Sequence, residues 1–380
     1  MRRSVLALAP LLLLAGGCGP DLDIVRDSTF RGHVKVRNFH VARGVVVTVP
    51  SDFVVESAGP AVVEGFIRGE VGSGASIEIR VSTGDLIVLG GLQAGSGADG
   101  EEPGADGGPG GRVLLRADRG VIRARGPLEA GAGGDGAGRR EEGRGELRVV
   151  SGAGGSGGDV SLAAPSVLID SGAAAGDGGD GGAAWARCVA LAPGAPNLVD
   201  SGADAPERTG ADEPPAPTGV ASATAGAGGA GGSVRVSGGA LRIDGPLRAG
   251  TGGSVARASA RGGNAASAAL SKPGTGGDVS VRSEGLTEPA SSWTLIPGDG
   301  GDAGLPADIM AEASARTAAS ASTRGGGDPG SVLVGAKTIA AGEGGDGGGV
   351  LAQSDAKARY GLGAPGQGSA PGQPVSKQAP

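Results

Sequence analysis

The chain has 380 residues, of which 82 are glycine and 2% are aromatic, and its formal net charge at pH 7 is −7. This composition excludes a wide core of large side chains, although valine, leucine, isoleucine and alanine suffice for a narrow one. The acidic balance and the scarcity of aromatic rings exclude the cationic, base-stacking surface of a nucleic-acid-binding protein, so no nucleic-acid partner is expected.

Residues 1–17 have the features of a secretory signal peptide. Two arginines are followed by an apolar run over 5–14 and by three small residues before Cys18, and the stretch is too short to span a bilayer. It resembles a bacterial lipobox, with Ala15 where the motif prefers leucine. The resemblance implies cleavage before Cys18, lipidation of its sulfur with diacylglycerol or palmitate, and attachment to a membrane through this lipid. Residues 18–30 are then a lipidated tether. Secretion with a free cysteine and an uncleaved anchor are the alternatives.

Residues 34–87 contain closely spaced strand patterns. The stretches GVVVTVP, DFVVES, AVVEGFIRG and SIEIRV alternate apolar and polar side chains, with a strand every eight to ten residues. This period of two predicts strands that bury one face.

Later in the chain, a two-strand unit recurs between glycine clusters. The second strand aligns across Leu86–Gly95, Ile122–Gly131, Val167–Gly176 and Leu241–Gly250. The first strand begins near Val113, Val160, Val234, Val279 and Val332. In the last aligned copy, the expected inward residues are Leu241, Ile243, Leu247 and Ala249. Residues 188–203 look like a degenerate copy that places Val189 between Val160 and Val234, and residues 147–155 like half of another.

A strand pair with one apolar face cannot bury that face alone, so we expect the units to stack. The predicted fold is all-β: a right-handed parallel β-helix (a solenoid) over residues 31–350, with long Gly/Ala-rich disordered or irregular loops. The longest of these loops is expected over 204–230, a short helix over 306–322, and a disordered tail over 351–380. Independent hairpins are the alternative.

The stretches GGDVSL…VLIDSGAAAGDGG and GGSVRV…LRIDGPLRAGTGG resemble the repeats of glycine-rich bacterial surface lipoproteins with a β-helical, adhesin-like region. An anchor at one end and a repeat along the length favour a non-catalytic cell-envelope protein. It would be a structural or adhesive stalk on the outer membrane or cell surface, and its glycine-rich loops would meet extracellular polysaccharide or another cell. The alternatives are a carbohydrate-active enzyme of the polysaccharide lyase or hydrolase type, and a secreted scaffold stabilised by metal.

Aspartates recur in the glycine-rich loops. Calcium prefers several oxygen ligands on a flexible turn, which makes Asp177, Asp180, Asp299 and Asp302 candidate ligands. These loops lack the calcium-binding nonapeptide pattern and offer one or two carboxylates each, so aspartate that simply favours a turn is the alternative. Calcium is the one cofactor hypothesis.

No catalytic residue is assigned. Asp170, Asp200 and Asp244 are expected in one outward column, but Glu64, Leu89, Arg125 and Val150 share it, and such a mixture is typical of a solvated face. The two histidines, His33 and His40, lie seven residues apart, on opposite faces if one strand carries both. Cys188 is expected to be a small buried residue. Arg139, Arg140 and residues 141–146 are expected to form a solvated loop.

Overall fold

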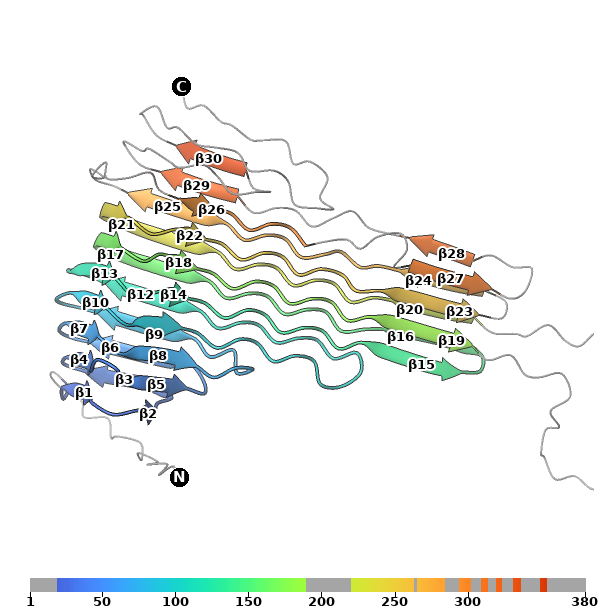
Figure 1. Cartoon of the computed structure of the whole chain (residues 1–380), viewed down its shortest axis with the longest axis horizontal. Coiled ribbons are helices and arrows are strands. Elements are labelled where there is room, and N and C mark those ends of the chain that lie inside the picture. The colour runs from blue at the N-terminus through green and yellow to red at the C-terminus, as the bar shows by residue number, and fades with distance from the viewer. Residues whose placement is uncertain are drawn as a thin grey trace, which may run out of the picture.

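The computed structural model describes residues 19–188, 220–262, 265–283, 294–301, 309–313, 319–322, 331–335 and 349–353. In these residues the regular secondary structure consists of strands, and every pair between them is parallel, which confirms the all-β class and contradicts independent hairpins. The strands form four sheets, A to D (Figure 1).

Sheets A and B lie together at one end of the molecule (Figure 1). Sheet A contains β1 (Leu22–Ile24), β3 (Gly32–Val36), β4 (Phe39–Val41), β6 (Phe53–Ser57), β7 (Ala61–Val63), β9 (Ile77–Val81), β10 (Leu86–Val88), β12 (Val113–Ala117), β13 (Val121–Ala124), β17 (Val160–Ile169), β21 (Val234–Ile243), β25 (Val279–Ser283), β29 (Ser331–Gly335) and β30 (Gly349–Gln353). Sheet B contains β2 (Ser28–Thr29), β5 (Val46–Val49), β8 (Phe66–Gly69), β11 (Gly91–Gln93), β14 (Leu128–Glu129), β18 (Ala173–Ala174), β22 (Leu247–Arg248) and β26 (Leu295–Ile296).

Sheets C and D lie at the opposite end. Sheet C contains β15 (Arg139–Gly143), β19 (Ala184–Cys188), β23 (Ala258–Gly262) and β27 (Ile309–Ala313). Sheet D contains β16 (Glu146–Val150), β20 (Val220–Thr224), β24 (Ala265–Ala269) and β28 (Ala319–Ser322).

The predicted right-handed parallel β-helix over 31–350 is wrong. Sheet A follows the order β1-β4-β7-β10-β13-β17-β12-β9-β6-β3, because the ten-residue strand β17 pairs with β12 through its first half and with β13 through its second. The sheet therefore turns back on itself into a nearly closed, barrel-like arrangement. The cause is local: β12 and β13 are separate strands, whereas Ala164 and Pro165 keep β17 continuous.

The predicted register of the second strands is confirmed. Leu86 pairs with Ile122, Ile122 with Val167, and Val167 with Leu241. The first strands pair equally well, in the series Val113, Val160, Val234, Val279 and Val332. The degenerate copy is wrong, because Val160 pairs directly with Val234 and Cys188 belongs to β19 in sheet C.

Two separate cores hold the sheets. The larger core, between sheets A and B, consists mainly of valine, leucine and isoleucine, with alanine and with Phe39 and Phe53. The predicted inward residues Leu241, Ile243, Leu247 and Ala249 are all buried there. The smaller core, between sheets C and D, consists mainly of alanine, with Val149, Val255, Leu270 and Cys188. Since each buried methylene contributes about 0.8 kcal/mol, the alanine core adds less stability per residue than the larger one.

Two sets of glycine-rich segments connect the two ends. We call them the outbound arms, residues 94–100, 130–138, 175–183, 249–257 and 297–301, and the return arms, residues 105–111, 151–159, 225–233 and 270–278. The first outbound arm reaches its return arm through a short turn at 101–104, whereas the outbound arms 130–138, 175–183 and 249–257 lead directly into β15, β19 and β23 of sheet C.

The backbone hydrogen bonds between the arms follow a repeat of three residues. The amides of Gly131 and Gly134 donate to the antiparallel return arm 105–111 at 2.9 and 2.8 Å, and the amide of Gly133 donates to the Asp177 carbonyl of the next outbound arm at 2.8 Å. A three-residue repeat without internal hydrogen bonds is the geometry of a polyproline II helix. Neighbouring arms thus satisfy the backbone groups that a strand would satisfy within a sheet.

Close packing requires glycine at the arm contacts. A Cβ atom added at Gly134 would lie 2.0 Å from the Ala98 carbonyl oxygen, and one at Gly155 would lie 1.9 Å from that of Gly108. The expectation of disordered or irregular loops is therefore wrong for these arms.

Other segments also differ from expectation. Within the expected tether, β1 and β2 are strands, and within the expected loop 204–230, residues 220–224 form β20. The helix expected over 306–322 is replaced by β27 and β28, and residues 349–353 form β30. Cys18, residues 204–219 and residues 354–380 lie outside the described residues.

Candidate functional site

Aspartates connect successive layers of the molecule. The Oδ1 atom of each aspartate accepts a hydrogen bond from the backbone amide at the equivalent position of the next layer, with N–O distances of 2.7–2.9 Å. We call this set the aspartate ladder: Asp27, Asp52, Asp85, Asp99, Asp106, Asp135, Asp159, Asp177 and Asp180. It gives the aspartate in the glycine-rich segments a structural role.

Two calcium candidates belong to this ladder. Asp177 accepts the Thr251 amide and Asp180 accepts the Ser254 amide, both at 2.7 Å. Asp299 lies on the next outbound arm, where its carbonyl accepts the Gly252 amide, and Asp302 lies outside the described residues. In the part of the chain that the structure describes, no three potential metal ligands form a group. Calcium stays a hypothesis, and an ion at Asp177 or Asp180 would compete with these amides.

The outward column of aspartates is partly confirmed. Asp170 lies between Arg125 and Asp244 in the stack, since Ala124 pairs with Ile169 and Ile169 with Ile243. Asp200 lies outside the described residues, and Val150 belongs to sheet D instead. Each carboxylate has its own arginine, because Arg125 lies 3.3 Å from Asp170 and Arg242 lies 2.8 Å from Asp244. Each of the two carboxylates is therefore engaged in an ion pair with an arginine.

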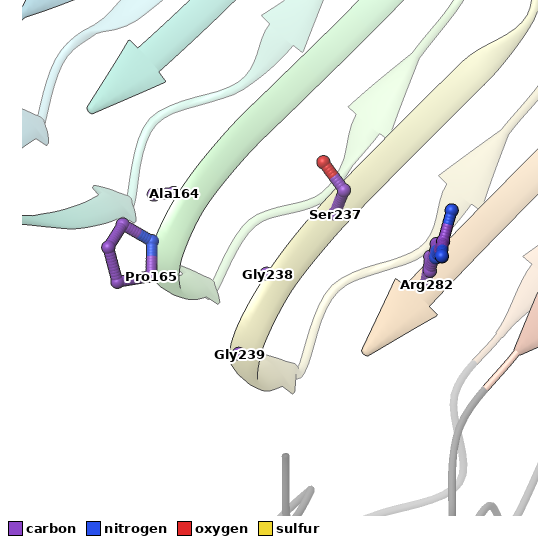
Figure 2. A pocket seen from close by; sticks show the side chains of 6 residues that line it. All are labelled: Ala164, Pro165, Ser237, Gly238, Gly239 and Arg282. Carbon is purple, nitrogen blue, oxygen red and sulfur yellow. The ribbon is translucent and has the colours of Figure 1, made fainter. Parts of the chain in front are cut away.

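A shallow hollow of about 290 Å³ lies where β17, β21 and β25 meet (Figure 2). Its lining is Ala164, Pro165, Ser237, Gly238, Gly239 and Arg282. The hollow exists because small residues occupy the bend of β17 and β21, and Arg282 and Ser237 provide its side-chain donors.

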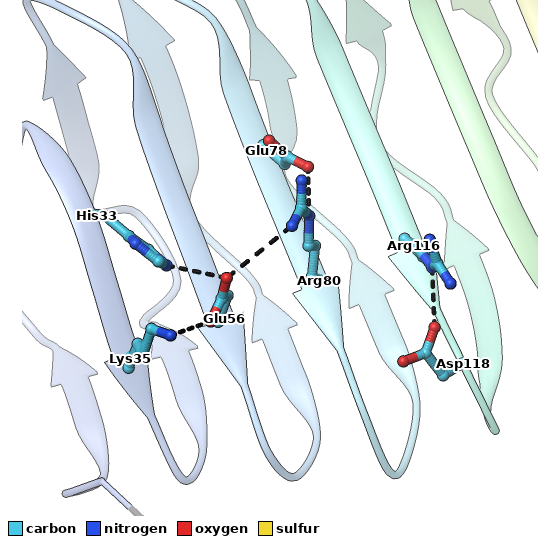
Figure 3. A network of polar contacts seen from close by, with 7 residues as sticks. All are labelled: His33, Lys35, Glu56, Glu78, Arg80, Arg116 and Asp118. Carbon is cyan, nitrogen blue, oxygen red and sulfur yellow. Dashed lines mark hydrogen bonds and ion pairs between the residues drawn. The ribbon is translucent and has the colours of Figure 1, made fainter. Parts of the chain in front are cut away.

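A charge network covers the outer face of β3, β6 and β9 (Figure 3). Glu56 is its centre, with Lys35 at 2.9 Å, His33 at 3.1 Å and Arg80 at 3.9 Å. The hydrogen bond from Lys35, together with the charges of His33, Lys35 and Arg80, holds the pKa of Glu56 below its ordinary value although partial burial opposes this shift.

The two histidines lie on different strands, His33 on β3 and His40 on β4. Each contacts one carboxylate of a neighbouring layer, with His33 against Glu56 and His40 Nδ1 2.7 Å from Asp23. Because the two histidines lie on separate strands, the expectation that they occupy opposite faces of a single strand does not apply.

Cys188 is buried at the end of β19, as expected. Its Sγ lies 3.1 Å from the Gly145 carbonyl oxygen and 3.2 Å from that of Val220. Burial raises the pKa of this thiol, which disfavours the thiolate that a nucleophile needs.

The expected solvated loop at 139–146 consists instead of β15, the start of β16 and the turn between them. On the outer face of sheet C, the guanidinium carbon of Arg140 lies 4.0 Å from the centre of the Trp185 ring. Beside this pair, Arg187 lies 3.5 Å from Glu142. Sequence reasoning missed this face because charged and alanine-rich stretches look like loops. The alternation in Ala184–Cys188 was the available signal, since it buries alanine and leaves Trp185 outward.

Comparison with protein-family models, with curated proteins and with solved structures gives no match for this chain. Within the described residues, no helix has the length and apolar character needed to cross a membrane.

Proposed function

We propose that this chain is a non-catalytic structural or adhesive protein of a bacterial cell envelope, anchored by a lipid on Cys18 at the outer membrane or cell surface. The motif around Cys18 supports the anchor, and the arrangement of the arms supports the mechanical role.

One observation carries the proposal. The glycine arms form a hydrogen-bonded slab that separates the two ends of the molecule, with sheets A and B at one end and sheets C and D at the other (Figure 1). Strand β1, which begins soon after Cys18, belongs to the end with sheets A and B. A nine-residue arm such as 130–138 with a rise of 3.1 Å per residue spans about 28 Å. A lipid near β1 would therefore leave sheets C and D well away from the anchor.

Rigidity is the second support. The arms share backbone hydrogen bonds with neighbours in their own layer and in adjacent layers, and the aspartate ladder adds bonds between layers. Each such bond contributes about 0.5–1.5 kcal/mol net, so their number makes a stiff connection. A stiff spacer suits a protein that presents one end to an external partner.

The test compares the parent chain with Cys18→Ala and with a deletion of the whole protein. We expect the parent to incorporate labelled palmitate, to fractionate with membranes and to be cut by protease added to intact cells. Cys18→Ala should be released, and both altered strains should attach less to surfaces or to other cells. Membrane retention of Cys18→Ala, or unchanged attachment after deletion, contradicts the proposal.

A further inference from the structure

Sheet C presents an arginine that is held in place by an aromatic ring. Arg140 on β15 pairs in register with Trp185 on β19, and its guanidinium carbon lies 4.0 Å from the ring centre. Stacking on a tryptophan face fixes the plane of a guanidinium, while its N–H donors lie in that plane and stay free at its edge.

The neighbouring charges are already paired with each other. Glu142 and Arg187 occupy the next outward register position and lie 3.5 Å apart. Glu141 pairs with Arg139 on the same strand. Among the described residues, Arg140 therefore has the ring as its partner and no carboxylate within ion-pair distance.

The position of β15 leaves this arginine accessible. β15 is the edge strand of sheet C, so no further strand of that sheet covers Arg140 on the side away from Trp185. The arms of the preceding layer turn back at 101–104 and do not continue into sheets C and D. A ligand can thus approach the outer side of the guanidinium along the edge of the sheet.

We propose that the Arg140–Trp185 pair binds the carboxylate or sulfate group of an acidic polysaccharide. The planar guanidinium matches the two oxygens of such a group through paired N–H donors. Because Trp185 already orders Arg140, binding loses less side-chain entropy than at a free arginine. This inference rests on the proposed function, which places sheet C at the end that meets an external partner.

Charge favours a polysaccharide over a nucleic acid as the occupant. On β15 and β19, the four outward residues Arg140, Glu142, Trp185 and Arg187 carry a net charge of +1, from two arginines and one glutamate, within a chain of net charge −7. One held cation suits a polymer with separated acidic groups, whereas a nucleic acid requires many phosphate contacts along a basic surface.

The binding experiment uses the full chain with Trp293→Phe, so that Trp185 is the remaining tryptophan. Calorimetry measures binding, and fluorescence reports its location, in titrations with polygalacturonate, dextran sulfate, neutral dextran and a DNA duplex. We expect heat and a change in Trp185 fluorescence with one or both acidic polysaccharides. Binding of polygalacturonate would identify the carboxylate as the ligand group, and binding of dextran sulfate would identify the sulfate.

Variants assign the site. Arg140→Ala should weaken binding about tenfold, as expected for loss of a charge-assisted pair of hydrogen bonds, and Arg140→Lys should restore only part of it. Arg248→Ala removes an exposed arginine from sheet B and should bind like the parent. Circular dichroism checks that each variant is folded.

Three results overturn the inference: no binding of either acidic polysaccharide, equal losses for Arg140→Ala and Arg248→Ala, or DNA bound as tightly as the polysaccharide. The outcome is separable from the proposed function. Failure of the titration leaves the Cys18-dependent localisation standing, whereas loss of that localisation leaves a positive titration intact.

Discussion

Replacing Gly155 with alanine should destabilise the protein although it adds one methyl group. The new Cβ would lie 1.9 Å from the Gly108 carbonyl oxygen, compared with a comfortable separation of roughly 3.5 Å. The return arms must therefore separate by roughly 1.5 Å, which breaks the hydrogen bonds around this point. Three such bonds join Gly155 N to Gly134 O, Gly179 N to Gly155 O, and Gly134 N to Gly108 O, each at 2.8 Å.

The loss of these hydrogen bonds sets the expected decrease in the free energy of unfolding. At about 1 kcal/mol each, three lost bonds cost about 3 kcal/mol. Alanine also lowers the entropy of the unfolded chain, which stabilises a protein by about 0.4–1 kcal/mol where the native structure accepts alanine without strain. At Gly155 the native packing does not accept it, so this gain does not offset the loss. We expect the free energy of unfolding to fall by about 3 kcal/mol.

Urea unfolding followed by circular dichroism measures this effect in the chain carrying Cys18→Ser. Gly143→Ala is the matched control, because a Cβ there would first meet Leu147 at 3.4 Å, an ordinary contact. The control should stay within about 0.5 kcal/mol of the parent. Equal stability of Gly155→Ala and Gly143→Ala would refute the close packing of the arms.

Three further predictions concern single side chains. Asp180→Ala should lower the free energy of unfolding by about 1 kcal/mol, because the hydrogen bond from the Ser254 amide is lost. Asp180→Asn keeps an acceptor oxygen and should lose less stability in the same urea assay. Equal stability of Asp180→Ala and the parent would contradict the aspartate ladder. Glu56 has a pKa below its ordinary value of 4.5, mainly through Lys35, so its contribution to stability is present above that value and is lost as pH falls through the folded-state pKa. Thermal unfolding from pH 7 to pH 3 should show a weaker pH dependence in Glu56→Gln, and identical profiles would count against the charge network. Cys188 should react slowly with iodoacetamide at pH 8 in the folded chain and rapidly in urea, since burial raises its pKa; equal rates would show an accessible thiol.

The strands of sheet A could be predicted from the sequence because their side chains carry the pattern. Alternation of valine, leucine and isoleucine identifies one buried face, and the recurring second strand fixed the pairing of Leu86, Ile122, Val167 and Leu241. The closure of sheet A could not be read in this way. It depends on whether Ala164 and Pro165 interrupt or continue a strand, which apolar periodicity does not report.

The order of the glycine arms escaped prediction for a physical reason. Glycine has no side chain, so a segment ordered by backbone hydrogen bonds to its neighbours shows no hydrophobic pattern. The available signal is a period of three, as in GDGGDGG at 176–182, where the two aspartates at Asp177 and Asp180 bond to the next layer. Sheets C and D were not predicted for a similar reason. The buried residues of strands such as Val220–Thr224 are alanines, which are also common in loops.

Hydrogen exchange tests most directly the claim that the glycine arms form an ordered slab. Mass spectrometry of peptides covering 130–138, 151–159 and 175–183 reports the amides that the structure pairs between arms. We expect slow exchange at these amides, with protection similar to that of β17 in sheet A. Exchange as fast as in an unfolded glycine-rich peptide would contradict this claim.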